Sequence, residues 1–158
     1  MRPGSRRAQP SFSRQGTTMN TLAQHAFNSN PQTVRAARDF VVGILDSWGG
    51  CARRDDIRLC VSELAGNAAT HASSPGDGYL VRLTRYERCV HLEVQDTGVG
   101  GGTVAVRPLT STDAGGRGLH IVQELSDEWG VEAHACDGKV VWTCFRRPGS
   151  KPRCSCRA

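Results

Sequence analysis

The fold of this chain is decided by the stretch from Cys89 to Gly100, which reads CVHLEVQDTGVG. In its first part Val90, Leu92 and Val94 alternate with polar residues. This period of two predicts a strand and places Asp96 on its buried side. A carboxylate at the edge of a core is costly unless a donor meets it, and the glycines that follow allow a ligand to come close. We therefore expect Asp96 either to bind a ligand or to cap its own turn.

The residues around this strand predict an α+β protein. Strands are expected over residues 22–27, 79–86, 89–95, 129–136 and 139–145, and helices over 31–48, 53–72 and 118–125. Asn30 and Pro31 would start the first helix, and Gly49-Gly50 would end it. Residues 97–116 show no sustained period and predict a long binding loop or lid. This order predicts a two-layer sandwich, with the helices on one face of a mostly antiparallel, mixed sheet.

Length and charge predict one domain with two basic tails. A chain of 158 residues fits a single domain, expected over 19–146, with disordered tails at 1–18 and 147–158. Met1 and Met19 both remain possible starts. The formal charge is +5, but once residues 1–18 and 146–158 are set aside, 11 basic residues face 15 acidic ones. The folded part therefore lacks the basic surface that direct nucleic-acid binding needs.

The cysteines and the hydropathy predict a soluble, cytoplasmic protein without a membrane partner. Five of the seven cysteines fall singly inside expected helices and strands: Cys51, Cys60, Cys89, Cys136 and Cys144. We expect them to be small, reduced, buried side chains. The sequence contains no CxxC pair, so a thiolate metal site is not expected. The apolar run at 40–45 is too short to span a bilayer.

Two further segments carry candidate chemistry. Glu63, Asn67 and His71 recur at four-residue steps along one flank of the helix expected over 53–72. They could be a solvated edge, but Gly66 and neighbouring alanines leave space around Asn67 for a large ligand. The second segment, Gly115-Gly116-Arg117-Gly118-Leu119, is a glycine-rich entry into a helix. It is either a plain helix start or a phosphate site with Arg117 as a fixed charge.

Two common nucleotide motifs are excluded. A P-loop needs Gly-Lys-Ser or Gly-Lys-Thr, and neither Lys139 nor Lys151 stands in that context. A dinucleotide fingerprint needs a third glycine that opens a helix, whereas Gly98-Val99-Gly100 runs into the irregular loop.

The three segments, in this order, resemble the motifs of the ATP-binding domain (Bergerat-type fold) shared by DNA gyrase, heat-shock chaperones, sensor histidine kinases and mismatch-repair ATPases. Residues 63–72 resemble its N box, 96–100 its first glycine box and 116–119 its second. The resemblance extends over roughly residues 20–146 and is closest to the small anti-sigma-factor serine/threonine kinases. The lid departs from that group, since no proline directly follows Gly100.

The resemblance implies a site for ATP and Mg²⁺. Asp96 would accept a hydrogen bond from the adenine amino group, Asn67 would ligate Mg²⁺, and Glu63 would act as general base. The other residues implied to line the nucleotide are His71, Gly98, Gly100, Gly115, Gly116, Arg117, Gly118, Leu119 and Thr143.

The implied partners are a sigma factor and a small antagonist protein, on which a serine or threonine would be phosphorylated. Histidine kinases need a phosphoacceptor helix pair, and gyrase-like proteins need a transducer domain. The chain leaves no room for either. A homodimer is left open. The alternative is a binding module that uses ATP to set its affinity for a partner without phosphorylating it.

Overall fold

The computed structural model of the chain describes residues 20–70, 77–96, 116–134 and 138–150. Its elements are, in chain order, β1 (Thr21–Asn28), α1 (Thr33–Ser47), α2 (Arg54–Thr70), β2 (Gly78–Arg85), β3 (Cys89–Asp96), α3 (Gly116–Leu125), β4 (Glu128–His134) and β5 (Gly138–Arg146). The predicted helices and strands coincide with these apart from their ends, where assignments commonly differ by a residue or two.

The strands form one five-stranded sheet in the order β1-β2-β3-β5-β4. Every neighbouring pair in it is antiparallel. The predicted α+β class is confirmed, but the parallel pair of a mixed sheet does not occur among the described strands. Two of the four pairs, β2 with β3 and β4 with β5, follow each other in the chain with no helix between them, as is typical of antiparallel strands.

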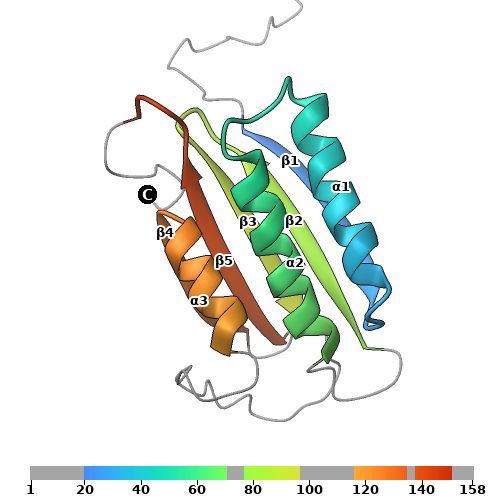
Figure 1. Cartoon of the computed structure of the whole chain (residues 1–158). Helices are drawn as coiled ribbons and strands as arrows, with labels where there is room; N and C mark the ends of the chain where they lie inside the picture. The colour runs from blue at the N-terminus through green and yellow to red at the C-terminus, as the bar shows by residue number, and fades with distance from the viewer. Residues whose placement is uncertain (1–19, 71–76, 97–115, 135–137, 151–158) are drawn as a thin grey trace, which may run out of the picture.

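All three helices cover one face of the sheet (Figure 1). Helix α2 lies between α1 and α3 and packs over β2 and β3. The core lies between these two layers, with fully buried residues such as Val41 from α1, Val61 from α2 and Leu92 from β3. This helix layer therefore fixes the position of α2, which carries two of the predicted site residues.

The start of α1 differs slightly from the prediction. The helix begins at Thr33, and its N-cap is Gln32. Asn30 caps the preceding turn instead, because its Oδ1 accepts from the Gln32 N–H at 3.0 Å and its carbonyl accepts from the Thr33 N–H. At the other end, Gly49 and Gly50 have φ of 92° and 91° and end the helix as predicted.

The beginning of α2 is clamped to the end of α3. Arg53 donates to Asp56, to Asp127 and to the carbonyl of Leu125. Asp127 Oδ2 also accepts from the backbone N–H of Arg146 at 2.7 Å. Burial raises the pKa of Asp127, but the hydrogen bonds from Arg146 and Arg53 outweigh it and hold that pKa below its usual range. This clamp fixes α3 relative to α2.

The chain after β5 packs against the turn between β2 and β3. Arg147 donates its N–H to the carbonyl of Arg88 at 2.8 Å, and Ser150 Oγ donates to the same carbonyl. Residues 147–150, predicted as the start of a disordered tail, thus form a hydrogen-bonded turn. The rest of both predicted tails lies outside the described residues.

The cysteines agree only in part with the prediction. Cys60 and Cys89 are buried, Cys51 is half-buried, and none of these three forms a disulfide. Burial raises the pKa of Cys60 to about 12, so its thiol is inert at neutral pH. Cys144 is buried but disulfide-bonded, which differs from the reduced state that the sequence predicts.

None of the helices in the described ranges is long and apolar enough to cross a membrane.

Candidate functional site

The predicted site segments meet at one end of the molecule. The end of α2, the end of β3 and the beginning of α3 all lie at the lower end in Figure 1. The β4–β5 hairpin reaches the same end, because its two strands pair up to His134 and Gly138. Segments that are far apart in the sequence are thus brought together on the helix-covered side of the sheet.

Gly118 brings the start of α3 directly against α2. A Cβ atom placed on Gly118 would lie 2.8 Å from Oε2 of Glu63 and 3.5 Å from Nδ2 of Asn67. The first of these distances is too short for a real Cβ contact, so a side chain at residue 118 would force the Glu63 carboxylate to shift. Glu63 and Asn67 are both half-buried. The structure therefore places a carboxylate and an amide beside the first turn of α3.

The first turn of α3 is a potential anion site. The backbone N–H groups of its first four residues, Gly116 to Leu119, have no acceptor within the helix, and they lie at the positive end of the helix dipole. Since Glu63 and Asn67 stand beside this turn, a bound phosphate would lie close to a carboxylate and an amide. This arrangement suits a phosphorylated ligand that also carries a cation.

Asp96 is the last residue of β3 and lies on the helix-facing side, as its phase predicts. Val90, Leu92 and Val94 on the same side belong to the core, while Asp96 is half-buried. Its neighbour on β2 is Tyr79, which is fully buried and hydrogen-bonded through its hydroxyl to Thr33 at 2.8 Å. Asp96 thus lies at the edge of the core, at the same end of the molecule as the end of α2 and the beginning of α3.

The β4–β5 hairpin supplies two residues that sequence reasoning missed. Gly138 lies against the backbone of Asp96. The β3–β5 register ends at Gln95 with Val140, so one more step places Lys139 opposite Asp96. Val141 on β5 faces the core, and alternation puts Lys139 on this same face. Both residues are identified only by the register of β5 against β3, which hydrophobic pattern alone does not specify.

Thr143, which was predicted to line the nucleotide, is not brought next to Asp96. It is fully buried, pairs with Leu92 and donates its hydroxyl to the Leu92 carbonyl at 3.4 Å. Along β3, Leu92 and Asp96 are four residues apart, or roughly 13 Å. Thr143 is therefore a core residue. The side chain of Leu119 also packs in the core, which leaves only its backbone N–H for the site.

Several predicted residues cannot be placed. His71, Gly98, Gly100 and Gly115 lie outside the described residues, as does most of the predicted lid at 97–116. Gly116 and Arg117 begin α3, but the side chain of Arg117 is not among those described. Their predicted roles remain predictions.

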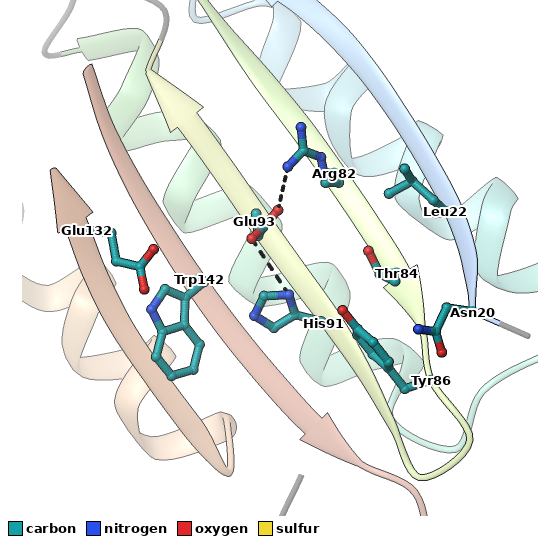
Figure 2. A pocket seen from close by; sticks show the side chains of 9 residues that line it. All are labelled: Asn20, Leu22, Arg82, Thr84, Tyr86, His91, Glu93, Glu132 and Trp142. Atoms are coloured by element: carbon teal, nitrogen blue, oxygen red, sulfur yellow. Dashed lines mark hydrogen bonds and ion pairs between the residues drawn. The ribbon is translucent and has the colours of Figure 1, made fainter. Parts of the chain in front are cut away.

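A separate hollow of about 490 Å³ lies on the opposite face of the sheet (Figure 2). Arg82, His91 and Glu93 line it and form a chain of contacts, in which Arg82 Nη1 lies 3.2 Å from one Glu93 oxygen and His91 Nδ1 lies 3.8 Å from the other. Trp142 and Leu22 form part of its walls. Because all three helices cover the other face, this hollow is distinct from the site at the ends of α2, β3 and α3.

The comparison with protein families agrees with this geometry. Residues 27–145 match the family model of the histidine kinase-like ATPase domain. The chain belongs to this family. The match covers α2, β3, α3 and the β4–β5 hairpin, so the site lies within the histidine kinase-like ATPase domain, and ATP is the ligand this family implies. None of the curated proteins matches the chain significantly.

Proposed function

We propose that this histidine kinase-like ATPase domain is a protein serine/threonine kinase that acts as an anti-sigma factor. It would bind a sigma factor and transfer the terminal phosphate of ATP to a serine or threonine of a small antagonist protein. The observation that supports phosphotransfer most directly is the position of Glu63. Its carboxylate oxygen lies beside Gly118, at the helix end where phosphate would bind.

The described residues fit ATP with Mg²⁺. Because Gly118 has no side chain, the first turn of α3 lies close beside the Glu63 carboxylate and the Asn67 amide. Mg²⁺ between phosphates needs few protein oxygens, so one amide oxygen is sufficient. Among the described residues, no three His, Cys, Asp or Glu side chains form a metal site of their own. When bound, Mg²⁺ neutralises charge on the phosphate oxygens.

Each residue then has one task. Asp96 accepts a hydrogen bond from the adenine amino group at the end of β3. The N–H groups of the first turn of α3, with Arg117, hold the phosphates. Asn67 would ligate Mg²⁺ through its amide oxygen. Glu63 accepts the proton of the attacking hydroxyl group, a role that typically contributes a rate factor of about 10²–10⁴.

The test is phosphate transfer from labelled ATP to a small antagonist-type domain that copurifies with the chain. Wild type should label it, and Glu63→Ala should bind ATP as tightly while losing roughly 10²–10⁴-fold in transfer rate. Glu124→Ala is the matched control, because Glu124 is an exposed glutamate on α3 that pairs only with His120 among the contacts described. The Glu124→Ala protein should transfer phosphate at the wild-type rate.

Two results would contradict the proposal that the chain is a kinase. In one, Glu63→Ala transfers phosphate at the wild-type rate. In the other, wild type labels no copurifying partner but changes its affinity for that partner with ATP, and the chain is then an ATP-gated binding module.

A further inference from the structure

Gly138, at the start of β5, lies directly against the backbone of Asp96. A Cβ atom on Gly138 would overlap the carbonyl oxygen of Asp96, and it would lie 3.2 Å from the carbonyl carbon and 3.7 Å from Asp96 Cβ. All three atoms belong to the residue that carries the candidate base-binding carboxylate. Backbone atoms cannot rotate away as the tip of a flexible side chain can, so a side chain at this position must change how the start of β5 and Asp96 lie against each other.

The backbone of Gly138 is also held in a conformation that favours glycine. Its φ is +79°, in the left-handed region. The Cα hydrogen that a side chain would replace points toward Asp96. The start of β5 therefore packs tightly on the end of β3. Glycine at residue 138 serves two purposes: it permits the turn, and it lets the hairpin lie directly on the Asp96 backbone.

We propose that Gly138 is a positioning residue for base selection: the β4–β5 hairpin sets where the Asp96 carboxylate lies, and thereby which purine the site accepts. This proposal rests on the proposed binding of ATP. Adenine presents an amino donor where guanine presents a carbonyl acceptor. A fixed carboxylate accepts from the first and repels the second, whereas a displaced one distinguishes them poorly. Positioning errors well below 1 Å are sufficient to weaken such a contact.

A matched control exists in the same chain. Gly149 has nearly the same φ, +81°, but a Cβ atom there meets nothing within 4 Å. Gly149→Ala therefore introduces the backbone strain alone, while Gly138→Ala introduces the strain together with the displacement of Asp96. The difference between the two variants isolates the contact with Asp96.

The experiment measures the affinities of ATP, GTP and inorganic tripolyphosphate, each with Mg²⁺, for the full chain. Wild type and Gly149→Ala should share the same preference for ATP over GTP. In Gly138→Ala this preference should fall by roughly ten-fold or more, since a charge-assisted hydrogen bond is lost. Tripolyphosphate affinity should stay the same in all three proteins, because the phosphate end of the site is not touched.

An unchanged ratio of ATP to GTP affinity in a folded Gly138→Ala protein overturns the proposal. An equal loss of affinity for ATP and for tripolyphosphate also overturns the proposal, because the substitution then weakens the whole site and not base recognition. If Gly138→Ala does not fold, Gly138→Asn replaces it, since asparagine tolerates positive φ but still carries a Cβ atom; Gly149→Asn is then its control. If wild type binds no ATP, the proposed function itself fails.

Discussion

Gly118 of α3 faces Glu63 of α2 so closely that a methyl group on the glycine would lie 2.8 Å from the carboxylate oxygen. We expect Gly118→Ala to displace this carboxylate and lower the rate of phosphate transfer by at least ten-fold, since general-base geometry is lost. Transfer rate and thermal stability should be measured on the same preparation.

Gly43→Ala is the control for this prediction. Gly43 lies inside α1 with nothing within 4 Å of an added Cβ, so alanine there should stabilise the helix by up to about 1 kcal/mol and leave transfer unchanged. A Gly118→Ala protein that transfers phosphate at the wild-type rate would show that Glu63 has room to adjust or plays no part.

Asn67 provides a second prediction. Asn67→Ala should abolish the dependence of nucleotide binding on Mg²⁺ while the melting temperature stays the same or rises, because alanine is the better helix former. Titration of ATP with and without Mg²⁺ measures this. Ser62→Ala, on the same helix, should behave as wild type. If Asn67→Ala retains the full Mg²⁺ dependence, Asn67 belongs to a solvated helix flank.

Features set by neighbouring residues were predictable from the sequence. The alternation of Val90, Leu92 and Val94 placed Asp96 on the correct face, because side-chain direction in a strand depends only on position within it. The glycine pair that ends α1 was predictable for the same reason, because it acts on the chain next to it.

Features set by pairing between distant segments were not predictable. Whether Thr143 or Lys139 lies beside Asp96 depends on the register of β3 against β5, and a choice among alternate residues of one strand cannot be made from hydrophobic pattern alone. The contact of Gly118 with Glu63 likewise depends on how α3 packs on α2. His91, a polar residue predicted to face away from the core, is buried on the other face of the sheet.

Asp127 provides a prediction about pH. Because its pKa is held below the usual value near 4, its carboxylate stabilises the folded chain above that pH. This contribution is lost as the pH falls through the lowered pKa. Asp127→Asn should therefore reduce the free energy of unfolding by about 1–2 kcal/mol at pH 7, and the difference from wild type should shrink steadily below about pH 4.

Denaturant unfolding at several pH values measures this effect. Asp55→Asn is the control, because the Asp55 side chain is 94% exposed and should contribute little at any pH. A difference between wild type and Asp127→Asn that is the same at pH 3 and pH 7 would show that shape, rather than charge, accounts for the contribution of Asp127.

Calorimetric titration of ATP with Mg²⁺ into wild type and Asp96→Asn tests the central claim, that the ends of α2, β3 and α3 form a nucleotide site. We expect wild type to bind in the micromolar range or more weakly, and Asp96→Asn to bind roughly ten- to a hundred-fold less tightly, since a charge-assisted hydrogen bond to the base is lost. Glu93→Gln, on the opposite face of β3, should bind as wild type. Equal ATP affinity in wild type and a folded Asp96→Asn protein would contradict the account.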